Sequence, residues 1–196
     1  MPELMDYSKV VKLLHKTVKK SRYYHSLNVV EMALSIAPRF SIDEESARYS
    51  AIYHDRYRNL SKRKILEACL HAKIKLEKVE IEKPMLLHGA LASIRMEEEL
   101  GYAPSAWKRA VRHHTLGSTE MGRLGAVLYI ADYLEIGRIH ISAKVRENIL
   151  ALDSLEQMVL AILDREKNYR LKKGKELPAV SLTLYKYLEE GNKFEN

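Results

Sequence analysis

Several features that would place this chain in a special class of protein are scarce or missing. The single cysteine, Cys69, cannot form an intramolecular disulfide, which excludes a disulfide-stabilised scaffold and is typical of a reducing compartment. No apolar run approaches the roughly 18 residues of a membrane span, and the first residues lack the apolar stretch of a secretory signal. Glycine and proline are few, and the 46% apolar content is too high for a disordered chain. We therefore expect a soluble, cytoplasmic protein with no membrane partner.

The basic charge of the chain is concentrated near its two ends. Lys and Arg exceed Asp and Glu by seven, but the excess lies in residues 1–23 and 165–175, while residues 24–164 are neutral. A neutral middle has no overall charge with which to follow a phosphate backbone. We therefore interpret both basic stretches as solvated helix surfaces, and we do not expect a nucleic-acid partner.

Apolar residues recur at helical spacing along the whole chain, with no alternating pattern typical of strands. The fold class expected is an all-α helical bundle. Ser21 and Ser61 are expected to cap helices, Ser41 with Glu44 forms a predicted capping box, and Pro84 is expected in the first turn of a helix. The stretch 75–83 is predicted to be a connection. The predicted helices lie near residues 7–20, 21–37, 41–59, 62–74, 84–101, 104–114, 121–135, 143–150, 154–173 and 181–190.

Titratable side chains interrupt several of the apolar segments. His54 and Asp55 follow Ala51-Ile52-Tyr53, His88 lies in an apolar stretch, and Asp132 has apolar or aromatic neighbours on both sides. A buried carboxylate loses many kcal/mol of hydration, and a divalent cation is among the few partners that restore it. Imidazole and carboxylate ligands suit Fe, Mn, Co, Ni or Zn.

A core histidine bonded to a backbone carbonyl is the alternative to a metal ligand. We assign that alternative to three of the eight histidines, His15, His71 and His140. Tyrosine is abundant, and Tyr49, Tyr53 and Tyr57 recur every four residues. We interpret this stripe as core or dimer contact, with nucleobase stacking as the alternative, and we treat Trp107 in the same way.

The order of these residues carries a family resemblance. His25, then His54-Asp55, then Asp132 resembles the H…HD…D pattern of the HD phosphohydrolase superfamily, an all-helical metal-dependent fold. Additional motifs resemble the bacterial YqeK-type symmetrical diadenosine tetraphosphate hydrolases over about residues 20–140. These motifs are Arg22-x-x-His25, Leu87-His88-Gly89-Ala90, His114-Thr115-Leu116-Gly117, Met121 and the stretch from Ile130 to Arg138.

The resemblance implies a single HD-type domain over residues 1–196, with helices of about 143–190 packed on the motif-bearing core. It also implies two divalent metal ions, most often iron, with Mn, Co, Ni, Zn or Mg as alternatives. Asp55 would bridge the two ions. We assign His114 rather than His113 as a ligand. The six ligands implied are His25, His54, Asp55, His88, His114 and Asp132.

The implied reaction is hydrolysis of a phosphoanhydride by a hydroxide between the metals, cleaving diadenosine tetraphosphate symmetrically to two ADP. Asp55, Arg22, Arg58 and Thr115 would be catalytic. Arg58 stands where the family usually has Lys, which keeps the charge but changes its shape. Arg22, Arg58, Thr115, Gly117 and Arg138 would bind the substrate, and a homodimer is expected.

Two other functions remain open at this point. The first is an HD phosphohydrolase acting on a different nucleotide, such as a nucleoside mono- or triphosphate or an alarmone. The second is a non-catalytic helical module that binds RNA or acts as an adaptor through its basic ends.

Overall fold

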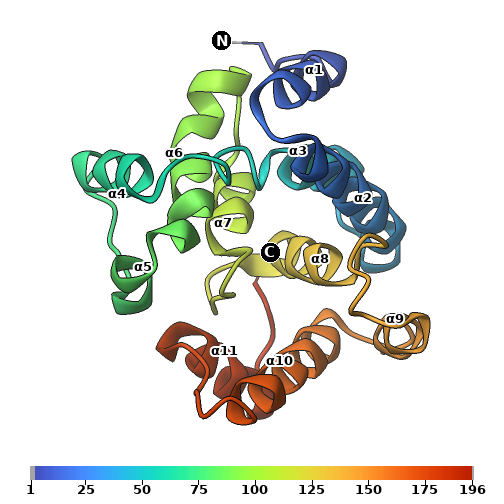
Figure 1. Cartoon of the computed structure of the whole chain (residues 1–196). Helices are drawn as coiled ribbons and strands as arrows, with labels where there is room; N and C mark the ends of the chain where they lie inside the picture. Colours follow the sequence, from blue (N-terminus) through green and yellow to red (C-terminus); the bar gives the residue numbers. More distant parts are fainter. Residues whose placement is uncertain (1–2, 196) are drawn as a thin grey trace.

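The computed structural model describes residues 3–195, and its regular structure within that range is helical, as expected (Figure 1). The short 3₁₀ helices η1 (Ala37–Phe40) and η2 (Pro84–Leu87) join longer α-helices. The α-helices are α1 (Tyr7–Thr17), α2 (Lys20–Ile36), α3 (Glu44–Tyr53), α4 (Lys62–His71), α5 (Lys78–Glu82), α6 (His88–Leu100), α7 (Ser105–His113), α8 (Gly122–Leu134), α9 (Ala143–Leu150), α10 (Leu155–Leu171) and α11 (Ala179–Glu189).

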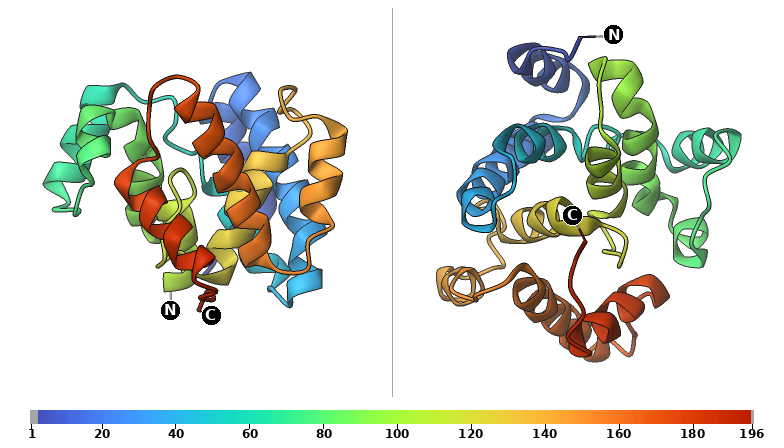
Figure 2. Two further views of the ribbon diagram at one scale, coloured as in Figure 1. Left: turned by 90° about the horizontal axis from the view of Figure 1, so that it is seen from below. Right: turned by 180° about the vertical axis from the view of Figure 1, so that it is seen from behind.

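Helix α8 is the centre of the bundle. Its residues from Leu124 to Ala131 are all buried, as expected for a helix that is apolar around its whole circumference. Helices α2, α3, α7 and α10 pack against it, and Figure 1 shows α8 between them. Helices α10 and α11 pack on one another and form a layer on one side of α8 (Figure 2).

A second, smaller core holds the peripheral helices α4 and α5 to η2 and α6. Ile65 and Cys69 of α4 are fully buried against Leu87, Ala90 and Leu91. The expectation of a simple connection over residues 75–83 was wrong, because α5 lies inside it. A capping box between Glu77 and Glu80 starts this short helix, which explains how a polar stretch forms a turn of helix.

Several predicted helix ends were displaced. The N-cap of α3 is Asp43, whose carboxylate accepts from Ser46 N at 2.7 Å, whereas Ser41 takes a left-handed conformation at the end of η1. Helix α2 begins at Lys20, so Ser21 is not its cap. Ser61 does cap α4. Pro84 opens η2 and not α6. Competing local hydrogen bonds determine where each of these helices begins, and the sequence pattern does not show which of them forms.

The tyrosine stripe is mostly core. Tyr49 and Tyr53 are buried, and the Tyr49 ring stacks on buried Trp107 with the centroids 5.1 Å apart. Helix α3 ends at Tyr53, so Tyr57 lies in the following turn, half-buried, and not on the same helix. The core interpretation is therefore right for Tyr49, Tyr53 and Trp107. Within the described part of the chain, no helix has the length and apolarity needed to cross a membrane.

Candidate metal centre

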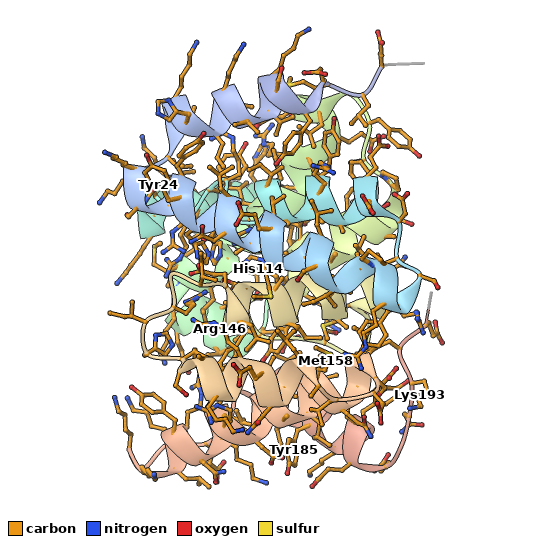
Figure 3. All side chains as sticks on the ribbon, turned by 90° about the vertical axis from the view of Figure 1, so that its right-hand side faces the viewer. Tyr24, His114, Arg146, Met158, Tyr185 and Lys193 are labelled. Atoms are coloured by element: carbon orange, nitrogen blue, oxygen red, sulfur yellow. The ribbon has the colours of Figure 1, made fainter. Side chains whose placement is uncertain are left out.

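Three helices end at the same place in the interior. His54 and His114 are the C-cap residues of α3 and α7, and Asp132 lies in the last turn of α8. The C-terminal end of a helix carries a partial negative charge from its unpaired carbonyl groups, which favours a cation. His25 from the middle of α2 and His88 at the start of α6 complete the cluster. His114 lies inside the bundle above the helices that carry Met158 and Tyr185 (Figure 3).

Each of the four histidines has its Nδ1 atom bonded to an oxygen. The Nδ1 atoms of His54, His88 and His114 lie 2.6, 2.6 and 2.8 Å from the carbonyl oxygens of Ala51, Met85 and Val111. His25 Nδ1 lies 3.1 Å from Glu135 Oε1. A carbonyl or carboxylate oxygen only accepts, so the proton of each neutral ring is on Nδ1. All four Nε2 atoms are then free to act as ligands.

These Nε2 atoms face one another in two pairs. The distance is 3.3 Å between His25 and His54 and 3.1 Å between His88 and His114. Two unprotonated nitrogens cannot bond to each other, and the four side chains are almost completely shielded from water. Apart from the Thr115 hydroxyl near His114 Nε2, the hydrogen bonds of the described residues give these acceptors no donor, and burying an acceptor without a partner is costly. A cation between the members of each pair would satisfy both, so the residues present fit metal ions.

Asp55 lies between the two pairs. Its Oδ1 is 2.8 Å from His88 Nε2 and 3.9 Å from His114 Nε2, while its Oδ2 is 3.4 Å from His54 Nε2 and 3.5 Å from His25 Nε2. One carboxylate oxygen thus faces each imidazole pair. This is the arrangement that a carboxylate bridging two cations requires.

Arginines neutralise both aspartates of the cluster. Arg22 donates to Asp55 Oδ2 at 2.6 Å, and Arg138 donates to Asp132 Oδ1 and, through Nε, to the Asp132 carbonyl at 2.9 Å. Asp132 Oδ1 is also 3.1 Å from His25 Nε2. The Asp132 side chain is 18% exposed, so it lies at the edge of the cluster rather than in the apolar core.

The protonation states suit a cation-binding site. Burial alone would raise the pKa of Asp55, but His54 and His88 hold it well below its usual value. Burial likewise opposes ionisation of Asp132, yet His25 and Arg138 lower its pKa. Burial and the neighbouring imidazoles lower the pKa of His114 to about 3. His54 is the exception, because Asp55 and Asp132 outweigh burial and raise its pKa, which favours the protonated ring until a cation takes the place of that proton. Ionised carboxylates and neutral imidazoles are the ligand forms that bind metals.

Glu135 is a site residue that the sequence analysis missed. Besides contacting His25, its side chain accepts from Asn28 Nδ2 at 2.9 Å and from Gly137 N. Glu135 is buried, and these donors together with His25 overcome burial and lower its pKa. A carboxylate behind a metal-binding histidine fixes the ring and its tautomer. Glu135 lies within the recognised Ile130–Arg138 motif, but nothing in the spacing shows which side chain it meets.

A pocket of about 920 Å³ opens over the cluster. Arg22, Arg58, Thr115 and Arg138, all expected to contact substrate, line it together with Asp55, His88, His114 and Asp132. Thr115 Oγ1 is 3.1 Å from His114 Nε2. Gly117, also expected to bind substrate, is not among the residues that line this pocket. Its φ is +70°, and a Cβ there would lie 2.5 Å from Leu184 Cδ2 of α11, so this glycine permits a turn and close packing.

The other wall of the pocket comes from the basic stretch of α10. Arg165, Tyr169 and Lys172 all line it. These side chains are exposed, as expected for a solvated helix surface, but the sequence analysis did not show that this surface faces the pocket. Sequence could not place α10 beside the cluster, because this contact joins residues that are distant in the chain.

The remaining histidines lie outside the cluster. His113 does not line the pocket, whereas His140 does. Burial and Arg112 lower the pKa of His113 to about 4. His15, His71 and His140 are exposed, so the expectation that they are core residues was wrong. All three lie at or beyond helix ends or on outer helix faces, where an imidazole stays hydrated.

Comparison with known proteins agrees with this geometry. The sequence model described as HD domain matches residues 22–137, which is more than half of the chain and includes all six side chains of the cluster. This chain belongs to the HD domain family. The His54-Asp55 pair after α3 is the element that gives the family its name.

Individual relatives are similar over nearly the whole chain of this HD domain protein. It is 26% identical to a symmetrical bis(5'-nucleosyl)-tetraphosphatase of Halalkalibacterium halodurans, covering 83% of this chain and 90% of the relative. It is 25% identical to the enzyme of the same name from Bacillus subtilis, covering 96% and 100%.

A solved structure is also similar to this chain in its fold. The crystal structure described as a predicted HD superfamily hydrolase involved in NAD metabolism, from Clostridium acetobutylicum, is 28% identical. It superposes with a TM-score of 0.87 and covers 97% of this chain and 100% of that one. The expectation of an all-α, metal-dependent HD hydrolase is confirmed.

Proposed function

We propose that this HD hydrolase cleaves diadenosine tetraphosphate symmetrically to two ADP. The observation that carries the proposal is the position of Asp55 between two facing imidazole pairs. Two relatives that align with most of the chain carry the name symmetrical tetraphosphatase, which supports the substrate. The ligands we assign to two divalent ions are His25, His54, Asp55, His88, His114 and Asp132.

The bound ions would supply Lewis acidity, lowering the pKa of a coordinated water and offsetting charge on phosphate oxygens. Iron is our choice of metal, since three or more imidazoles with carboxylates suit it, although Mn, Co, Ni and Zn suit the same ligands. Location in the cytoplasm and a homodimer stay predictions from the sequence.

The arginines of the pocket divide into two kinds. Arg22 and Arg138 are paired with Asp55 and Asp132, so they hold these carboxylates in place and can turn to phosphate oxygens once cations neutralise the aspartates. Arg58 lines the pocket and has no carboxylate within ion-pair distance among the described residues. Its planar guanidinium is free to bind a phosphate with two hydrogen bonds. Thr115 offers a hydroxyl to the same region.

Product analysis combined with metal content tests this proposal. The purified protein, loaded with Fe²⁺ or Mn²⁺, is expected to bind two metal equivalents and to convert diadenosine tetraphosphate to ADP alone. ATP plus AMP as products, or the absence of nucleotide products, would refute the substrate assignment. A panel containing nucleoside mono- and triphosphates and an alarmone identifies the alternative HD phosphohydrolase.

Two variants test the ligand set in the same assay. His88→Ala and Asp132→Ala are each expected to lower the metal content and to abolish hydrolysis, while His71→Ala, an exposed residue outside the cluster, retains both. A single metal equivalent in the native protein would contradict the two-metal arrangement. Hydrolysis that survives complete chelation would contradict metal dependence.

A further inference from the structure

We propose that Arg165 and Tyr169 of α10 and Lys172, the residue that ends this helix, bind the nucleotide in the pocket. Arg165 and Lys172 would contact its phosphates, and the Tyr169 ring would contact its base. The proposal rests on the proposed function for the class of ligand, a nucleotide. It assigns substrate recognition to a helix outside residues 22–137, the range matched by the HD domain model.

The three side chains share one face of the helix. Positions 165, 169 and 172 are four and three residues apart, the spacing that stacks side chains along one side of an α-helix. This face of α10 is turned to the pocket that also contains His88 and His114. A ligand bound at the cluster and longer than one phosphate would thus extend along α10.

The charges on this wall are available to an anion. Within the described residues, neither Arg165 nor Lys172 has a carboxylate within ion-pair distance, and Arg165 donates only to the hydroxyl of Tyr133 at 3.2 Å. The one acidic residue of the wall, Glu166, is bound by Arg170 at 2.7 Å. Its negative charge is therefore compensated by its own helix. The wall presents two uncompensated positive charges to the pocket, which matches a polyphosphate.

Tyr169 gives the wall an aromatic surface. The residue is 59% exposed although it lines the pocket. Lys173 donates to its hydroxyl at 2.5 Å, and the ammonium lies 4.4 Å from the ring centroid. This contact restrains the ring and occupies one part of it, leaving the rest open to a flat, apolar partner. A nucleobase fits that description, because bases stack on aromatic rings without requiring a particular sequence of hydrogen bonds.

Two probes separate the phosphate contacts from the base contact. Binding of ADP and of inorganic tripolyphosphate to the full-length, metal-loaded protein is measured by isothermal titration calorimetry. Arg165→Gln and Lys172→Gln are each expected to weaken both probes about 10-fold, as loss of a charge-assisted hydrogen bond does. Tyr169→Leu is expected to weaken ADP by a factor of about 5–10 and to leave tripolyphosphate unchanged, whereas Tyr169→Phe retains the binding of ADP.

Lys175→Gln provides the matched control, because Lys175 belongs to the same basic stretch but does not line the pocket. This variant is expected to bind both probes as the native protein does. If Arg165→Gln and Lys172→Gln behave like Lys175→Gln, α10 is not the phosphate-binding wall. If Tyr169→Leu weakens tripolyphosphate as much as ADP, the ring does not contact the base.

The calorimetric result is independent of catalysis. If the α10 variants weaken ADP binding but the native protein releases no ADP from diadenosine tetraphosphate, this inference holds and the proposed function fails. If the native protein performs the symmetrical cleavage but the α10 variants bind both probes normally, the proposed function holds and this inference fails.

Discussion

The Nε2 atoms of His88 and His114 lie 3.1 Å apart, although the Nδ1 atom of each ring is bonded to a backbone carbonyl. The carbonyls of Met85 and Val111 fix the same tautomer in both rings, and neither ring can donate to the other. The fold therefore holds two buried acceptors in contact, at a cost in stability that a cation removes. The fold thus preorganises the ligand atoms for a cation.

Metal binding is consequently expected to stabilise the protein. At a free metal concentration of 100 times the Kd, the free energy of unfolding rises by about 2.7 kcal/mol, which raises the Tm by about 5–10 °C for a chain of this size. Differential scanning calorimetry with Mn²⁺ or with EDTA measures the shift. His88→Ala is expected to reduce it, and His15→Ala, on the exposed face of α1, keeps it in full. An unchanged Tm on chelation of the native protein would contradict a built metal site.

Gly89 is expected to be necessary for the geometry of His114. A Cβ at this position would lie 2.7 Å from the Val111 carbonyl oxygen and 2.9 Å from His114 Cε1, so Gly89→Ala must push α6 from α7 or turn the ring. Overpacking of this kind costs about 1–3 kcal/mol of stability. Metal content by elemental analysis is expected to fall as well, because the ring moves with the Val111 carbonyl.

Gly125→Ala is the control for the effect of packing alone. A Cβ there would lie 2.7 Å from Met121 Cβ, a side-chain atom outside the cluster. This variant is expected to lose stability but to retain its metal. If both glycine variants keep the native metal content, the close approach at Gly89 does not serve the metal centre.

The residues of the candidate site could be predicted from the sequence more fully than the residues that hold them in place. His54, Asp55, His88 and Asp132 could be named because polar residues in apolar helical segments demand compensation. His25 and His114 were named only through the family pattern. Spacing alone does not bring them together, since the cluster joins five helices. Only a family pattern, which records a fold already known, supplies that long-range information.

The helical class followed from periodicity, while the details that shape the pocket did not. The end of α3 at Tyr53 places His54 and Asp55 at a helix terminus, where the partial charge of the carbonyls adds to the field at the site. Sequence favoured continuation of that helix. The basic face of α10 likewise looked solvated, because composition cannot show that Arg165 and Lys172 face a pocket whose other wall is formed by residues between 22 and 141.

Glu135 is expected to position His25 rather than to bind metal. Glu135→Ala removes the acceptor from His25 Nδ1, which frees the ring to rotate or change tautomer and should weaken metal binding about 10- to 100-fold. Glu135→Gln keeps an oxygen that can accept from His25 and is expected to recover part of the affinity. Competition with a chelator of known affinity measures both. Equal affinity of Glu135→Ala and the native protein would exclude the positioning role.

The buried pair of Glu80 and Arg112 is expected to be the main electrostatic anchor of the α5 region. Arg112 donates to both carboxylate oxygens, at 2.5 and 2.9 Å, and Glu80 is only 1% exposed. Arg112→Met removes the ion-pair partner of a buried carboxylate, which then keeps only its hydrogen bond from Glu77 N, and this costs about 3–5 kcal/mol of stability. The exposed pair of Arg63 and Glu67 has a similar N–O distance of 2.9 Å, but Arg63→Met should cost less than about 1 kcal/mol because water screens it. Urea unfolding at neutral pH measures both costs, and equal costs for the two methionine variants would show that burial of Glu80 does not strengthen the pair.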